Sequence, residues 1–408
     1  MAITLAESLG QWQSHGHLFV VADGMGAHAA GELASKLATD TIPHAYIKGI
    51  PELSPSESIT SAVRQANEVI YNKGQDTVDF QGMGTTCSCL LLLPSGALVS
   101  HVGDSRIYRL RGEEFQQLTF DHSLVWEMAA AGHSSEEEVP AYVPKNVITR
   151  SLGPHPTVAV DLEGPFALQS GDRFLLCSDG LTGPLSPQLI GMVLATHAPN
   201  EAAQTLVDLA NLLGGPDNIT VVLAEVLDRS KLGNSATPDL LEISPSAVAS
   251  RSSVSPLVWA AVGIAAVSAC LFAIKGDYEV ATGCGGALVI LTMLAWLRRV
   301  SGGEPRASAH SIGLQGKAPY RCHTCTPNAP NIETLTDIVR QLEDLEDHRD
   351  WDFDWKPIHT ERLRAHQAIA KGDYPGATIA YCSSVRRLMQ AIRDANMSQP
   401  SDSTIDLG

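Results

Sequence analysis

Residues 21–26 read Val-Ala-Asp-Gly-Met-Gly and lie at the end of an apolar run, residues 17–22 (HLFVVA), that is typical of a buried strand. Three other stretches also place an Asp beside Gly or Asn at the edge of a predicted strand: residues 103–106 (GDSR), 177–180 (CSDG) and 214–218 (GGPDN). Such an Asp offers a hard oxygen ligand on a rigid element, and the Gly lets a backbone oxygen approach the same ion. Without paired His or Cys the set favours Mg²⁺ or Mn²⁺ over zinc, although each stretch alone is an ordinary turn.

The rest of residues 1–227 alternates apolar strand patterns with helical periodicity. Two hairpins of strands are predicted, residues 87–93 with 97–102 and residues 107–111 with 114–118. Helices are predicted before and after them, over residues 57–73 and 200–213. Ser56 is expected to cap the first helix and Gly74 to end it. Hairpins with helices elsewhere favour an antiparallel α+β architecture over a doubly wound parallel sheet.

Composition excludes several classes of function. The chain has 408 residues and a net charge of -17, so an acidic surface argues against nucleic acid as a partner. Its eight cysteines lack the dense spacing of a secreted disulfide scaffold, which indicates reduced cytosolic thiols. No secretory signal precedes the first strand.

The middle of the chain carries a membrane signal. After a linker of Ser, Pro and Ala over residues 228–255, the uncharged runs 256–274 and 280–297 predict two transmembrane helices. A pair of buried core helices is the alternative. Basic residues near the predicted ends indicate an inner-membrane location with both large parts in the cytoplasm: Arg229, Lys231, Arg251, Arg298 and Arg299.

The C-terminal part, residues 301–397, is predicted to be a small helical region, followed by a disordered tail over residues 398–408. Its expected helices cover residues 332–346, 360–371 and 377–393. Residues 368–393 look like one unit of a tetratricopeptide array, which suggests a partner-binding surface at most. Cys322 and Cys325 form a lone CxxC, weak evidence for zinc.

The ordered segments resemble the bacterial branch of the protein phosphatase 2C family, whose members carry V-A-D-G-M-G, G-M-G-T-T, G-D-S-R, S-D-G and D-N in this order. In this chain the segments are residues 21–26, 82–86, 103–106, 178–180 and 217–218, and residues 118–123 (LTFDHS) match a further family stretch. The resemblance covers residues 17–226. It implies a four-layer α-β-β-α sandwich of two antiparallel sheets with a two-metal centre at one end.

The resemblance also implies the metal ligands. Asp23 would bridge both Mg²⁺ or Mn²⁺ ions and Gly24 would offer its carbonyl oxygen. Asp179 and Asp217 would complete the shell of one ion, so that Asp23, Asp179 and Asp217 are the expected catalytic residues. Asp104 matches an acidic residue that helps to hold a third, weaker ion.

The reaction that the resemblance implies is hydrolysis of phosphoserine or phosphothreonine in proteins by a water that bridges the metals, without a covalent intermediate. Phosphorylated proteins, targets of serine/threonine kinases, would be the partners. Asn218, beside Asp217, and His28 are expected to support the site. His28 could protonate the leaving alcohol, although a His that opens a helix is more often structural.

One departure from the family pattern bears on activity. Family members begin with a strand that bears an Arg, followed by an Asn-Glu-Asp run, and nothing before Asp23 fits this pattern. The first arginine is Arg64, inside a predicted helix. We expect a truncated or mis-assigned start with the first strand missing. The alternative is an impaired pseudophosphatase that acts as a membrane-bound scaffold or phosphoprotein-binding module.

Overall fold

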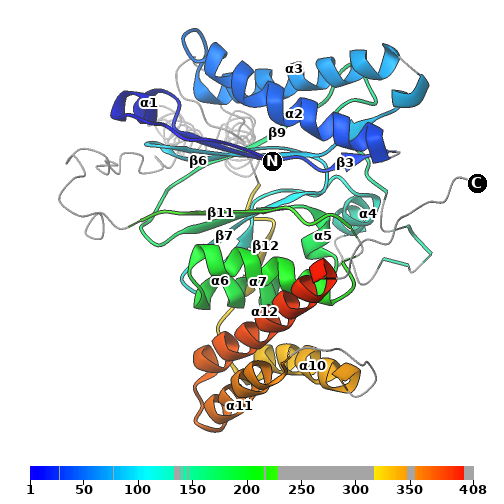
Figure 1. The fold of residues 1–408 in the computed structure, drawn as a ribbon. Coiled ribbons are helices and arrows are strands. Elements are labelled where there is room, and N and C mark those ends of the chain that lie inside the picture. Colours follow the sequence, from blue (N-terminus) through cyan, green and yellow to red (C-terminus); the bar gives the residue numbers. More distant parts are fainter. Residues whose placement is uncertain are drawn as a thin grey trace, which may run out of the picture. The chain divides into compact units, whose positions relative to one another are not determined.

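The computed structural model describes residues 1–227, 317–346 and 354–398, apart from residues 27, 77, 133–138, 141, 145–146 and 216 (Figure 1). The described residues all belong to one compact unit. Two five-stranded antiparallel sheets form its centre, and helices α2 (His28–Gly49) and α3 (Pro55–Asp76) lie on the opposite side from α6 (Pro187–Thr196) and α7 (Pro199–Leu212). The predicted α+β sandwich is confirmed.

The first sheet lies under α2 and α3. Its strands follow the order β1 (Ala2–Thr4), β2 (His17–Val21), β5 (Cys87–Leu93), β6 (Gly96–Val102) and β9 (Asp161–Phe166). Side chains alternate across each strand, so Leu18 and Val20 of β2 pack toward α2 and α3, whereas Phe19 and Val21 join the core between the sheets. This alternation makes β2 apolar on both faces, which explains its uninterrupted apolar sequence.

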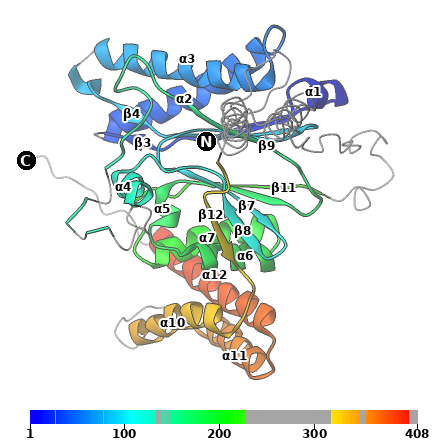
Figure 2. The ribbon, with the colours of Figure 1, turned by 180° about the vertical axis from the view of Figure 1, so that it is seen from behind.

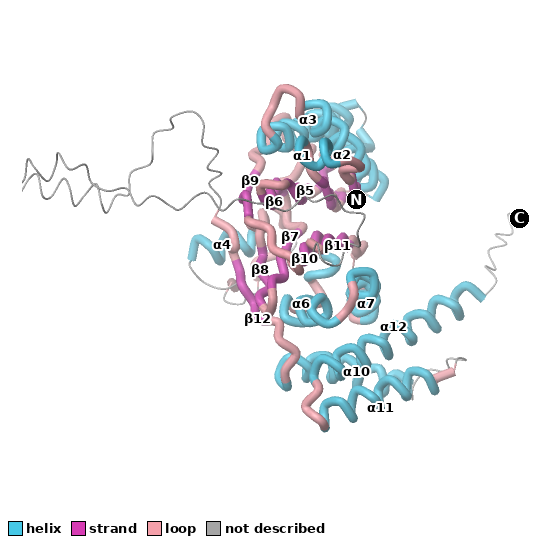
Figure 3. The backbone as a smooth tube through the Cα atoms, turned by 90° about the vertical axis from the view of Figure 1, so that its left-hand side faces the viewer, coloured by secondary structure: helices cyan, strands magenta, loops and turns pink. Residues whose placement is uncertain are grey.

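The second sheet lies against α6 and α7, as Figures 2 and 3 show from other sides. Its strands follow the order β11 (Val221–Glu225), β10 (Arg173–Cys177), β7 (Arg106–Arg111), β8 (Glu114–Gln117) and β12 (Arg321–Thr324). The remaining elements of this part of the chain include one longer helix, α4 (Leu124–Gly132). The others are short: α1 (Leu9–Ser14), β3 (Gly24–Met25), η1 (Val78–Phe80), β4 (Gly84–Thr85) and α5 (Asp179–Thr182). β12 comes from beyond residue 316 and completes a sheet built otherwise from residues 106–225.

The ends of α3 differ from the prediction. Ser54, and not Ser56, caps the helix: its Oγ accepts a hydrogen bond from the Glu57 N–H at 3.3 Å, and Glu57 Oε2 accepts one from the Ser54 N–H at 3.1 Å. This reciprocal capping box follows from the Glu three residues after Ser54. Gly74 does not end the helix, which continues to Asp76, because the turn at Gly74 is buried close to the Phe80 carbonyl.

Two elements near the start of the chain were not predicted. β1 pairs antiparallel with residues 18–20 of β2 and occupies one edge of the first sheet. α1 begins after Ser8, whose Oγ accepts a hydrogen bond from the Gln11 N–H at 3.3 Å. Both elements are too short for hydrophobic periodicity to reveal them.

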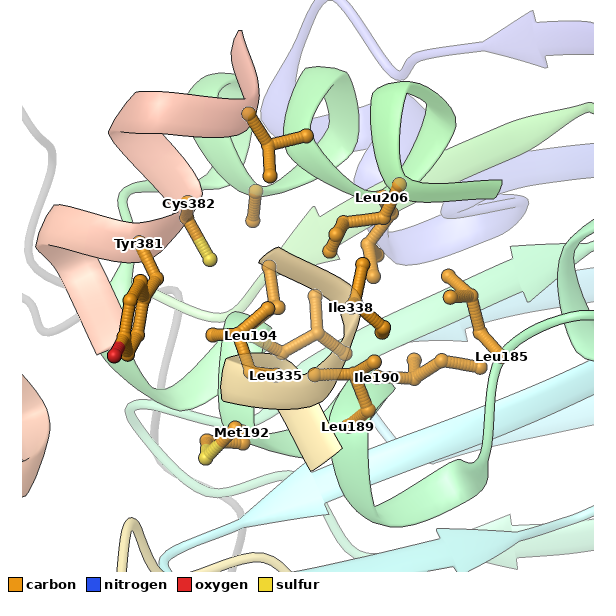
Figure 4. Close-up of a cluster of buried hydrophobic side chains, with 14 of the residues drawn as sticks. Leu185, Leu189, Ile190, Met192, Leu194, Leu206, Leu335, Ile338, Tyr381 and Cys382 are labelled. Carbon is orange, nitrogen blue, oxygen red and sulfur yellow. The ribbon is translucent and has the colours of Figure 1, made fainter. Parts of the chain in front are cut away.

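The C-terminal helices share a hydrophobic core with α6 and α7. α10 (Ala329–Glu346), α11 (Lys356–Ala370) and α12 (Tyr374–Ser398) contain the three predicted helices, apart from Lys371, where α11 has already ended. Figure 4 shows side chains from these helices meeting side chains of α6 and α7, among them Leu335, Ile338, Tyr381, Leu189, Ile190 and Leu206. Arg393 of α12 also pairs with the buried Asp208 of α7 at 2.7 Å. The sequence analysis treated residues 301–397 as a separate region, whereas the described part of it packs on the sandwich.

The membrane prediction requires a correction. The predicted spans over residues 256–274 and 280–297 lie outside the described residues, as do the linker over residues 228–255 and residues 399–408 of the tail. Among the helices that the structure describes, none has both the length and the apolar character to cross a membrane. The longest, α12, carries charged residues such as Arg386 and Arg387. The two-span inner-membrane location, with both large parts in the cytoplasm, is therefore not supported.

We predict that Leu335→Ala destabilises the domain as a whole, because this side chain is fully buried between α10 and α6. The free energy of unfolding should fall by about 2 to 5 kcal/mol, the usual cost of such a cavity. Urea denaturation followed by circular dichroism would measure it. Leu363→Ala, on the exposed side of α11, is the matched control and should change stability by less than about 0.5 kcal/mol. Equal stability of the Leu335→Ala protein and the wild type would contradict a shared core.

Candidate metal centre

Asp23 is held rigidly at the end of β2. Its backbone N–H donates a hydrogen bond to Thr86 Oγ1 at 2.9 Å, and its carbonyl oxygen accepts one from the Thr86 N–H at 2.8 Å. The Thr85 hydroxyl donates a further bond to the same carbonyl at 2.8 Å. Both threonines lie far from Asp23 in the sequence, so their role in fixing Asp23 appears only in the structure.

Gly24 follows Asp23 and lies against the first turns of α2. A Cβ atom at Gly24 would stand 2.0 Å from the Gly31 carbonyl oxygen, so only glycine allows this close approach. His28 opens α2, and its side chain lies outside the described atoms. The approach of α2 to β3 fixes the backbone at Gly24.

Asp179 begins α5, directly after β10. The neighbouring Ser178 is buried, and its hydroxyl donates a hydrogen bond to the Asn218 carbonyl at 3.1 Å and accepts one from the Thr220 N–H at 3.0 Å. These bonds join the segment that carries Asp179 to the segment that carries Asp217. Asn218 therefore contributes through its backbone, which the Asp-Asn pattern alone did not indicate.

The four predicted aspartates lie close enough to perturb one another. Burial, and then the carboxylates of Asp179, Asp217 and Asp104, together raise the pKa of Asp23 to about 7. Burial and the charge of Asp217 also raise the pKa of Asp179, which shares a side-chain hydrogen bond with Asp23. Burial, then Asp179 and Asp121, raises the pKa of Asp104 to about 7. Four separate segments thus bring like charges together.

The chemistry of this set fits a hard divalent cation, because every side-chain donor is a carboxylate and the added positive charge would relieve the repulsion. Within the described residues, however, no three His, Cys, Asp or Glu side chains are already arranged to share one ion. Asp179 and Asp217 are exposed, so their carboxylates are accessible to an ion from solvent. The donors are therefore brought near one another without a complete ligand shell.

Asp104 lies in a loop that His122 holds. The Gly103 N–H donates a hydrogen bond to His122 Nδ1 at 2.9 Å, and the Gly103 carbonyl accepts one from the His122 N–H at 2.7 Å. His122 Nε2 lies 3.0 Å from Asp161 Oδ2. Both ring nitrogens are occupied in this way, so His122 is a structural residue of the loop.

The CxxC pair does not form a metal site with other described residues. Cys322 is exposed on β12, whereas Cys325 is buried against Gly191 of α6. Burial raises the pKa of the Cys325 thiol to about 12, which disfavours the thiolate that zinc requires. Cys325 acts as a small core residue.

The sandwich and its ordered aspartates define a phosphatase domain of mixed α+β architecture. The family model for protein phosphatase 2C matches residues 8–214, and the chain belongs to this family. It falls within the enzyme class of protein serine/threonine phosphatases.

Characterised relatives agree with this assignment. The chain is 40% identical over 214 residues to protein phosphatase PhpP of Streptococcus pneumoniae, an alignment that covers 51% of this chain and 85% of the relative. It is 37% identical over 214 residues to serine/threonine protein phosphatase PstP of Mycobacterium tuberculosis, covering 52% of this chain and 40% of that protein. A crystal structure of the M. tuberculosis phosphatase PstP/Ppp has 37% sequence identity and a TM-score of 0.48, with coverage of 52% of this chain and 88% of that one. Another describes the PstP catalytic domain in complex with two manganese ions, at 36% identity and a TM-score of 0.45, with the same coverage of both chains.

We predict that Asp23→Asn stabilises the metal-free protein while it weakens metal binding. Because the pKa of Asp23 lies near 7 in the fold and near 3.8 when unfolded, ionisation of this carboxyl opposes folding. The penalty is absent below about pH 4 and complete above about pH 7. At pH 8 with EDTA the variant should gain on the order of 1 to 3 kcal/mol, measured by thermal or urea unfolding.

Asp76→Asn provides the control, since its side chain is 61% exposed at the end of α3. Its stability should stay within about 0.5 kcal/mol of the wild type. A gain at Asp23→Asn that did not shrink between pH 8 and pH 4 would show that relief of carboxylate repulsion is not its cause.

Proposed function

We propose that this chain hydrolyses phosphoserine and phosphothreonine in proteins with two Mg²⁺ or Mn²⁺ ions held by Asp23, Asp179, Asp217 and the Gly24 carbonyl. The observation that carries the proposal is the effect of the carboxylates on one another. Burial is the larger cause of the raised pKa of Asp23, and the charges of three other aspartates add to it. An arrangement so costly for the metal-free fold is typical of a site that binds cations. Asp104 is proposed to help hold a further ion.

The divalent ions, when bound, supply an activated water and neutralise negative charge on the phosphoryl group. The residues of the chain position these components. Asp23, fixed through Thr85 and Thr86, defines the centre of the site. Asp179 and Asp217 approach from two segments that Ser178 joins. His28, at the start of α2, is proposed to protonate the leaving alcohol or to support the helix end.

Arg64, the first arginine of this sequence, lies on α3 and lines a cleft of about 770 Å³ with residues such as Tyr71 and Thr157. A phosphoprotein-binding scaffold is the second candidate function, and the cleft at Arg64, which none of the four aspartates lines, favours it.

Metal-dependent activity would separate the two functions. With Mn²⁺ the full chain should hydrolyse p-nitrophenyl phosphate and a phosphothreonine peptide, and EDTA should abolish both reactions. Asp179→Ala should reduce kcat/KM by at least about 100-fold, because it removes a carboxylate that balances the charge of the ions. Asp337→Ala on α10, whose side chain is 52% exposed, should retain wild-type rates.

Two results would contradict the proposal. Hydrolysis that persists in EDTA would exclude the metal mechanism. A wild-type chain that binds phosphopeptide without hydrolysing it at saturating Mn²⁺ would favour the scaffold.

A further inference from the structure

A C-terminal segment, residues 318–325, is attached to both sheets, and we call it the C-terminal strap. Its strand β12 pairs with β8, and two further backbone bonds extend the pairing: Tyr320 N–H to the Gln117 carbonyl and Cys325 N–H to the Glu113 carbonyl, both at 2.9 Å. The Tyr320 hydroxyl and the Ala318 N–H donate to the two carboxylate oxygens of Glu163. Glu163 belongs to β9 of the other sheet and is only 5% exposed.

The strap also reaches α4, the helix that follows the Asp121-His122-Ser123 segment. The Arg321 guanidinium lies 3.8 Å from the ring centroid of Trp126, a residue of α4 that is only 4% exposed. Phe120 makes edge contacts with the Trp126 ring at 5.7 Å and with the Tyr320 ring at 5.4 Å. The indole is therefore fixed by side chains from the strap and from its own segment.

Trp126 connects the strap to the candidate metal centre through Arg106. The Arg106 guanidinium lies 5.5 Å from the same indole centroid and pairs with Asp121 at 2.6 Å. Arg106 comes two residues after Asp104, in the loop of the metal centre. The guanidinium of Arg106 is therefore held between the Trp126 ring and Asp121, directly beside the loop that carries Asp104.

We propose that Arg321 is a positioning residue for the metal centre. It holds the Trp126 indole against Arg106 and so fixes the charge beside Asp104. The inference rests on the proposed function, and it assigns part of the phosphatase site to a segment that lies outside residues 8–214, the range that the family model matches. A cation over an indole is a favourable contact, and the contact is stronger where water is excluded, as it is at Trp126.

Residues that orient metal ligands from outside the first layer commonly change metal affinity by roughly 10- to 100-fold when they are mutated. Arg321 acts less directly, through Trp126 and then Arg106. We therefore expect a smaller change, roughly 3- to 10-fold. The effect should fall on Mn²⁺ affinity, because the loop of Asp104 loses a constraint while its carboxylate is retained.

The test is a calorimetric titration of Mn²⁺ into the metal-free full chain, which measures binding without reference to activity. Arg321→Ala should weaken Mn²⁺ binding by roughly 3- to 10-fold. Arg321→Lys should recover part of the affinity, since an ammonium group also binds an indole face. Arg340→Ala removes an arginine of α10 that is 66% exposed, and it should bind Mn²⁺ as the wild type does.

The outcomes separate the two proposals. If the wild type binds no Mn²⁺, the proposed function and this inference both fail. If the wild type binds Mn²⁺ and Arg321→Ala binds it equally well, only the positioning role of Arg321 is overturned. Equal losses in Arg321→Ala and Arg321→Lys would also overturn it if circular dichroism shows that both variants are folded, because a lysine should preserve part of a cationic contact.

Discussion

Repulsion between carboxylates is the constraint on which the organisation of this domain depends. Asp23, Asp104, Asp179 and Asp217 come from four segments, and the charge of each of the other three opposes the ionisation of Asp23. Such a cluster tends to push its members apart unless the backbone beneath it is rigid. Rigidity comes from neutral hydrogen bonds at the strand ends, from Thr85 and Thr86 just before β5 and from Ser178 just after β10. The two sheets therefore serve as a frame for charges that would separate in solution.

The C-terminal helices complete the opposite side of this frame. Leu189 and Ile190 of α6 and Leu206 of α7 are buried in a core to which α10 and α12 also contribute. β12 covers the outer edge of β8, where unpaired backbone groups would otherwise face solvent. The described residues after 316 are consequently part of the folded phosphatase unit, and the charged pair of Arg393 with buried Asp208 fixes α12 on α7.

Sequence patterns predicted several of the long elements, because their signals are local, although no range was predicted for α2. β5 coincides with the predicted strand over residues 87–93, and α7 with the predicted helix to within one residue at each end. The errors have local causes too: the Glu after Ser54 outweighed Ser56 as a cap, and a buried turn carried α3 past Gly74. Hydropathy also suggested two membrane spans over residues outside the described structure, and the helices that are described offer none.

The order of the aspartate motifs, the strand and helix types and the likeness to protein phosphatase 2C were determined by the sequence, since each depends on residues close together in the chain. Tertiary structure decided which carboxylates meet, and that Thr86 and the Asn218 carbonyl hold them in place. It also decided that Arg321 reaches Trp126. The reason is physical: periodicity tells which face of an element is buried, but hydrogen bonds and ring contacts between distant segments depend on a partner that the local sequence does not specify.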